Sequence, residues 1–182
     1  MVDGSPKYVT VVSDTDVNEG WREHRADGGM IIDIDRNKVV CEGLSMPHSP
    51  RWYQDKLWVL NSGTGHFGYV NLKKKKFEAV AFCPGYARGL SFAGDFALIG
   101  LSTIRDNKTF ADLPLSENLS KAKVEARCGI QVIDLRTGDS VHSMNITGIV
   151  KELYDVLVLP NVVRPMALGF KSDEIRRTIS VE

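Results

Sequence analysis

The segments GMIIDID (Gly29–Asp35), FGYVNLK (Phe67–Lys73) and IQVIDLR (Ile130–Arg136) are three copies of one strand. Each alternates apolar with polar residues and then runs into a polar turn, which is typical of a β-strand that buries one face. A strand that recurs in this way indicates an architecture built from repeated units.

Other short strands surround these copies, separated by Gly, Asp, Asn and Pro. Four of them follow one another within about 33 residues, at Pro50–Tyr53, Leu57–Asn61, Phe67–Leu72 and Phe77–Phe82. This is the size of one blade of a β-propeller. Strands are also expected at Lys7–Val12, Met30–Ile34, Lys38–Glu42, Ala87–Phe92, Phe96–Leu101, Ile130–Leu135, Ser140–Ile146, Leu153–Leu159, Arg164–Phe170 and Thr178–Val181.

The spacing of the copies indicates an insertion. Asp33 and Asn71 are 38 residues apart, whereas Asn71 and Asp134 are 63 apart, an excess of 25. The excess corresponds to residues 103–127, which do not alternate and in which Ser116 is expected to cap a short helix that runs to Val124. The sequence therefore predicts an all-β chain, with residues 1–182 as one partial propeller domain of about three and a half four-stranded blades.

Composition places the chain among ordinary globular proteins. Lys plus Arg and Asp plus Glu both number 23, so the formal net charge is zero and no nucleic-acid partner is expected. No apolar stretch is long enough for a membrane span, and Met1–Pro6 is not a signal peptide. The three widely spaced cysteines indicate reduced thiols in a cytoplasmic protein rather than disulfides or a zinc site.

Three stretches, HSPRWYQDKLWVLNSGTG (His48–Gly65), FCPGYARGLSFAGDFALIGLS (Phe82–Ser102) and GIQVIDLRTGD (Gly129–Asp139), resemble an uncharacterised family of propeller-like proteins. That family carries a domain of unknown function, sometimes beside tetratricopeptide repeats. Its members are about twice this length, so the resemblance implies that the chain corresponds to their C-terminal half. The resemblance supports the fold and brings no activity with it.

The candidate ligand-binding residues lie at the starts of the first strand of each blade, because those strands line the central channel of a propeller. They are His48, Ser49, Arg51, Tyr86, Arg88, Tyr154 and Asp155. An aligned register places Arg88 beside Asp155, either to bind a carboxylate or phosphate of a ligand or to form an Arg–Asp pair between blades.

Two loops supply further candidates. Asn61–Gly65 contains two glycines and small hydroxyl residues, and it is either a loop with exposed amides or an ordinary turn, with Asn61 as a possible channel ligand. The loop Asp14–Gly29 is longer than a hairpin needs, and we expect Trp21 to anchor it. Its other candidate residues are Asp16, Arg22 and His24, which do not have the spacing of a metal site.

These patterns favour a binding or interaction module that uses the channel mouth, for a small molecule or a protein, with no cofactor and no metal. One alternative is a metal-dependent hydrolase or lactonase of the six-bladed type, with Asn61, Asp155 and Glu152 as the nearest ligands. Another is a truncated, non-autonomous fragment of a longer propeller. An open arc of blades exposes strand edges, so we expect either a homo-oligomer or missing N-terminal blades.

Overall fold

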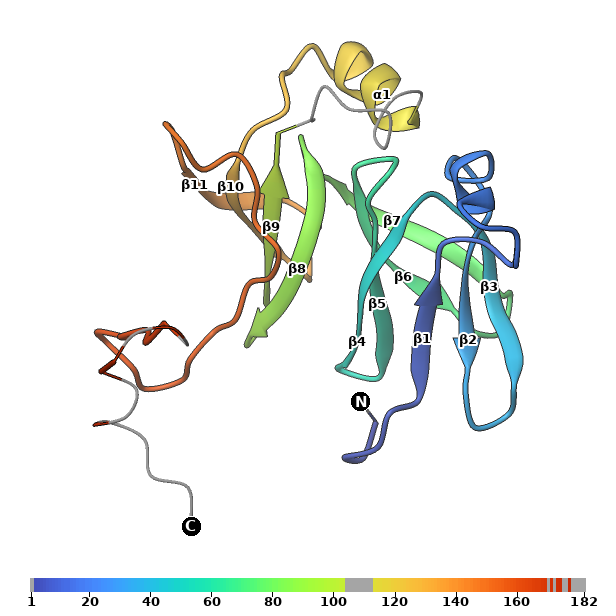
Figure 1. The fold of residues 1–182 in the computed structure, drawn as a ribbon, viewed down its shortest axis with the longest axis horizontal. Coiled ribbons are helices and arrows are strands. Elements are labelled where there is room, and N and C mark those ends of the chain that lie inside the picture. Colours follow the sequence, from blue (N-terminus) through green and yellow to red (C-terminus); the bar gives the residue numbers. More distant parts are fainter. Residues whose placement is uncertain (1, 104–112, 170, 172, 175–176, 178–182) are drawn as a thin grey trace.

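A computed structural model describes residues 2–103, 113–169, 171, 173–174 and 177. These residues form three antiparallel sheets, one α-helix and one turn of 3-10 helix (Figure 1). The expectation of an all-β chain is therefore confirmed.

The three sheets are named here by their position in the sequence. The N-terminal sheet contains β1 (Tyr8–Val11), β2 (Gly29–Asp33) and β3 (Lys38–Leu44), with the 3-10 helix η1 (Gly20–Arg22) between β1 and β2. The middle sheet contains β4 (Pro47–Tyr53), β5 (Lys56–Asn61), β6 (His66–Asn71) and β7 (Lys76–Phe82). The C-terminal sheet contains β8 (Tyr86–Ala93), β9 (Phe96–Ser102), β10 (Gly129–Asp134) and β11 (Ser140–Asn145), with the helix α1 (Pro114–Ala122) between β9 and β10.

The repeated segments occupy the same place in every sheet. They form β2, β6 and β10, and each of these strands is the last but one of a meander in which consecutive strands are neighbours. In β2 the fully buried residues alternate along the strand, as a period of two requires. The three similar segments thus hold corresponding places in three sheets.

The sheets pack face to face, so that the core lies between them. One cluster joins the N-terminal and middle sheets through Ile31, Leu44, Leu57 and Val59. A second joins the middle and C-terminal sheets, and within it Trp58 stacks on Phe67 with ring centroids 5.0 Å apart. Each fully buried large side chain contributes about 1.5–3 kcal/mol. Strand β4 packs against both β1 and β8 in this arrangement (Figure 1).

The helix begins earlier than expected. Pro114 occupies the first turn and Leu113 is the N-cap residue, without a side-chain cap bond, so Ser116 does not cap the helix. Proline is common at this position because the backbone N–H groups of the first turn have no partner within the helix, so the N–H that proline lacks is not missed. The helix ends at Ala122, where Lys123 adopts a left-handed conformation. Within the described residues, no helix is long and apolar enough to cross a membrane.

The last expected strands are not strands. Residues 153–159 run beside β8 without joining a sheet, and residues 165–169 have no regular structure. Ser102 and Ser91 hold this segment through the backbone N–H groups of Leu153 and Val158. A strand needs a partner along its edge, and the pattern of apolar residues cannot supply one. The predicted strand at 178–181 lies outside the described residues.

Candidate ligand-binding site

A pocket of about 390 Å³ lies where β1, η1, β4 and β8 approach one another. Its lining residues come from separate parts of the chain. They are Val12, Ser13, Thr15, Trp21, Met46, His48 and Arg88. The structure thus brings together three of the residues that the sequence singled out, namely Trp21, His48 and Arg88.

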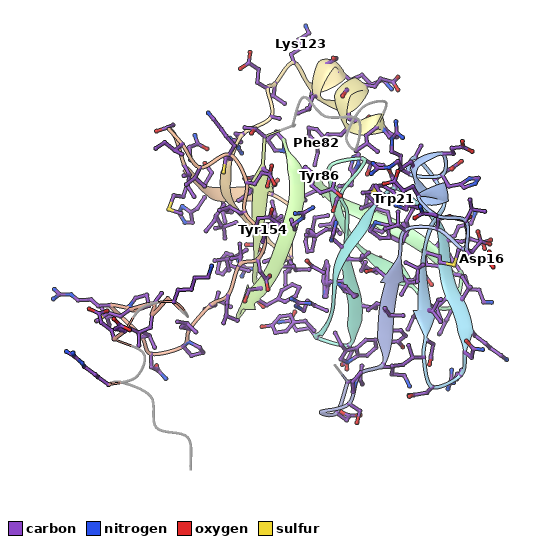
Figure 2. All side chains as sticks on the ribbon, viewed as in Figure 1. Asp16, Trp21, Phe82, Tyr86, Lys123 and Tyr154 are labelled. Atoms are coloured by element: carbon purple, nitrogen blue, oxygen red, sulfur yellow. The ribbon has the colours of Figure 1, made fainter. Side chains whose placement is uncertain are left out.

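Aromatic side chains flank Arg88. The guanidinium carbon lies 5.4 Å from the ring centre of Tyr86 and 5.0 Å from that of Tyr154. In Figure 2, Tyr154, Tyr86 and Trp21 follow one another across the view from β8 towards η1. Aromatic faces attract guanidinium groups without neutralising them.

The charge of Arg88 is not matched by a carboxylate in the described part of the chain. The Nε atom of Arg88 is buried and has no hydrogen-bond partner among the described residues. Such an atom costs free energy unless a ligand or water satisfies it. Of the residues that line the pocket, only Arg88 and His48 have basic side chains, and none has an acidic side chain.

His48 is neutral at physiological pH. Burial, assisted by the nearby positive charge of Arg88, lowers the pKa of His48 to about 4. Its Nε2 atom lies 3.1 Å from the hydroxyl oxygen of Tyr86, whose pKa is raised to about 12, chiefly by burial. The pocket wall therefore carries one positive charge, on Arg88, beside two polar groups that stay neutral.

Trp21 links the long loop to the rest of the pocket. It is partly buried against a cluster that contains Met46, Tyr86 and the helix residues Leu115 and Leu119. The guanidinium of Arg22 lies 4.6 Å from the Trp21 ring and also bonds to Glu19, at 2.8 Å. Through these contacts the long loop packs against the cluster.

Arg88 does not pair with Asp155. Instead, Arg51 lies 3.8 Å from Asp155, and both side chains are largely exposed, so the pair contributes little stability. The guanidinium of Arg88 lies over the ring of Tyr154, and the backbone of residues 155–156 closely approaches Gly89. Ser49 has a structural contact, because its hydroxyl accepts a hydrogen bond from the Gly89 N–H at 3.2 Å.

The turn Asn61–Gly65 is covered and its amides are not open to a ligand. The Asn61 side-chain oxygen accepts a hydrogen bond from the Ser45 N–H at 2.7 Å, and the amide of Gly63 donates to Ser45. Helix α1 lies over the turn, where Asn118 donates to the carbonyl oxygen of Thr64. Of the two interpretations left open by the sequence, these contacts favour an ordinary turn.

The remaining loop candidates do not line this pocket. Asp16 and His24 are exposed, and Figure 2 places Asp16 at the outer edge of the molecule. His24 and Arg22 line a separate hollow of about 410 Å³ on the loop itself. Within the described residues, no group of three or more His, Cys, Asp or Glu side chains is placed to hold a metal ion.

Several pocket residues escaped the sequence analysis. Val12, Ser13 and Thr15 follow β1, and Met46 precedes β4. No motif marks them, because they reach the pocket only through the packing of one sheet on the next. Their common position at the end or start of a strand is the signal that would have found them.

Comparison with known proteins gives a family and distant structural likenesses. The profile of a domain of unknown function, DUF4915, matches residues 1–168. No curated protein matches the chain. The crystal structure of the computationally designed Ika8 protein is similar, with a TM-score of 0.41 and 14% identity, over 71% of this chain and 34% of that one. The chain thus spans about a third of the designed protein. Because the profile covers nearly the whole sequence, the chain belongs to the DUF4915 family.

Proposed function

We propose that this protein is a binding module that takes a small acidic ligand in the pocket at Arg88. The observation that carries the proposal is the buried Nε atom of Arg88, which lacks a partner among the described residues. A carboxylate or phosphate oxygen satisfies such a donor and matches its charge, and a guanidinium can hold either group through two parallel hydrogen bonds.

The surroundings of Arg88 support the same ligand class. The aromatic rings of Tyr86 and Tyr154 restrict the guanidinium in advance, so that less freedom is lost when a ligand binds. His48 is neutral and therefore does not compete for the anion. A volume of about 390 Å³ falls within the range of small-molecule sites.

We further propose that the three sheets are blades of a partial β-propeller, with residues 1–182 as one domain and residues 103–127 inserted in a blade. The identical strand order of the middle and C-terminal sheets supports this arrangement, as does the close approach of β4 to β8. In a propeller the innermost strands surround a channel, so the pocket at the starts of β4 and β8 would open at the channel mouth.

No observation favours the hydrolase alternative. The side-chain oxygen of Asn61 already accepts a backbone hydrogen bond, and Asp155 pairs with Arg51. Both residues thus have structural partners.

Titration of the purified chain with inorganic phosphate, citrate and a nucleoside monophosphate tests the proposal, with glycerol as a neutral comparison. We expect at least one anion to raise the melting temperature and to bind in calorimetry. The variant R88Q should weaken that binding about tenfold or more, and R88K by less, because lysine lacks the planar fork. The control R164Q removes an exposed arginine outside the pocket and should bind as the unmodified chain does. Failure of all three anions, or equal binding by R88Q, contradicts the proposal.

A further inference from the structure

We propose that this chain forms a dimer in which residues 151–159 of each copy add a strand to the open edge of β1 in the other copy. The inference rests on the propeller arrangement proposed above and is independent of the ligand. Addition of an extended segment to an exposed sheet edge is a common way in which proteins associate.

The first step is that residues 151–159 lie where the innermost strand of a further sheet belongs. Ser62 and Ser102 occupy equivalent places in the middle and C-terminal sheets. Tyr53 pairs with Lys56 at the first hairpin of the middle sheet, and Ala93 pairs with Phe96 at the first hairpin of the C-terminal sheet. Ser62 follows Lys56 by the same number of residues as Ser102 follows Phe96. The Ser62 hydroxyl donates to the carbonyl oxygen of Ala87, in β8, at 2.6 Å.

The Ser102 hydroxyl makes the corresponding contact one sheet further on. It donates to the carbonyl oxygen of Leu153 at 3.3 Å and accepts from the Leu153 N–H at 3.0 Å. Residues 151–159 are therefore positioned on the C-terminal sheet as β8 is positioned on the middle sheet.

The second step concerns where this segment ends. From Ala87 to the turn at Gly94 is the same number of residues as from Leu153 to the turn at Pro160. Each turn contains a left-handed residue, Gly94 with φ 54° at the first position of one and Asn161 with φ 61° at the second position of the other. The segment thus has the length of an innermost strand, although among the described residues no strand pairs with its outer side.

The third step is that the N-terminal sheet lacks such a strand. Strands β4 and β8 begin the two four-stranded sheets, whereas the N-terminal sheet has three strands, and in the described structure β1 pairs only with β2. Unpaired backbone groups along an edge favour strand addition. Apolar side chains are exposed on both elements: Val9 on β1 by 42%, and Leu157 on the segment by 74%.

Residues 151–159 do not reach the open edge of β1 in their own chain. Within one chain, β4 and β8 lie between β1 and residues 151–159, and Figure 1 shows the two elements on opposite sides of these strands. Two copies related by a two-fold axis would form two identical junctions and close into a ring of six four-stranded sheets. A ring of six lies within the range of four to eight blades that propellers have.

Sedimentation or light scattering of the full chain tests the proposal. We expect a dimer that L157E and V9E each weaken about tenfold or more, because each change buries a charge at the junction. V141E is the matched control, since Val141 has an exposed fraction of 41%, close to that of Val9, but lies on the outer strand β11. Circular dichroism establishes that each variant is folded.

Disulfide trapping then identifies the two elements in contact. We expect an intermolecular disulfide when V9C and V158C are mixed and oxidised, and none when either variant is oxidised alone, because these two positions correspond to the paired residues Ala97 and Phe92 of the C-terminal sheet. A monomer, a dimer unaffected by L157E and V9E, an open polymer or the absence of the mixed disulfide overturns the proposal. R88Q should remain a dimer, which separates failure of this proposal from failure of the ligand site.

Discussion

His48 and Arg88 reach the same pocket because the strands that carry them are irregular in the same way. The pairing of β4 with β5 shifts register between His48 and Arg51, and that of β8 with β9 shifts between Ala87 and Leu90. A bulge of this kind bends a strand and redirects its side chains, and bulges are common beside functional sites. The two bulges therefore set which side chains face the pocket.

His48 makes the stability of the protein sensitive to pH. Its pKa is lowered to about 4 in the folded chain, against an ordinary value of about 6.5, so the unfolded chain binds the proton more tightly. The stability that this difference in pKa contributes is fully present when the pH is above the ordinary pKa of about 6.5, and it is lost as the pH falls towards 4. Between about pH 7 and 5 we expect the free energy of unfolding to fall by about 1–2 kcal/mol, measured by urea unfolding at each pH.

The variant H48Q should show a smaller dependence on pH over the same range. It will not remove the dependence, because partial burial also lowers the pKa of His66. H142Q changes an exposed histidine on β11 and is the control for the loss of a histidine elsewhere in the fold. An unchanged slope in H48Q would contradict the assignment of a neutral buried imidazole.

At this scale the sequence predicted the strand-start residues His48 and Arg88, but not their partners. Alignment of the apolar segments at residues 89–92 and 156–159 placed Arg88 beside Asp155, whereas in the structure Arg88 lies over Tyr154 and Asp155 lies near Arg51. Met46 and Ser13 were missed because contacts between sheets leave no periodic signal.

Residues 151–159 are held in place by contacts with the C-terminal sheet. Their contacts include the serine hydroxyls of β8 and β9 and the close approach of the backbone at residues 155–156 to Gly89. The eleven strands were predicted to within about three residues, because local alternation and turn residues determine them. The final segments have the same alternation but no sheet partner in the described structure, which is why the prediction failed there.

The variant G89A should detach residues 151–159 from β8. Gly89 has φ 81°, and a Cβ atom there would lie 2.5 Å from the backbone nitrogen of Val156. We expect faster hydrogen exchange and faster proteolysis at 151–159, with the middle sheet unaffected.

Gly94 provides the control for this change. It also has a positive φ, of 54°, but a Cβ atom would meet nothing within 4 Å, so G94A has the conformational cost without the collision. Equal exchange in the two variants would show that the close approach to residues 155–156 does not hold the segment.

The molecule as a whole combines zero formal charge with exposed apolar side chains near its C-terminus. The sequence pI is about 6.9. Val163 and Met166 have exposed fractions of 92% and 93%, so they remain available for contacts between molecules. Without net charge, little repulsion opposes such contacts at neutral pH.

We therefore expect self-association beyond any defined oligomer to be greatest near pH 7 and weaker at about pH 9, where the chain is negatively charged. The double variant V163K/M166K should lower turbidity at pH 7 without changing the melting temperature, because neither side chain is buried. V163S/M166S removes the apolar surface without adding charge, and so distinguishes the effect of apolar contacts on turbidity from the effect of charge. Turbidity that is independent of pH would contradict the role of charge.

The three cysteines each accompany a different sheet. Cys41 lies within β3, Cys83 directly follows β7 and Cys128 directly precedes β10, and all three are buried and free. Burial raises the pKa of Cys41 to about 11 and that of Cys83 to about 12, and it also raises that of Cys128. Thiols in this state react slowly with alkylating reagents until their surroundings open. The native sequence thus contains an internal reporter for each sheet, and mass spectrometry of alkylated peptides can follow the order in which the sheets come apart.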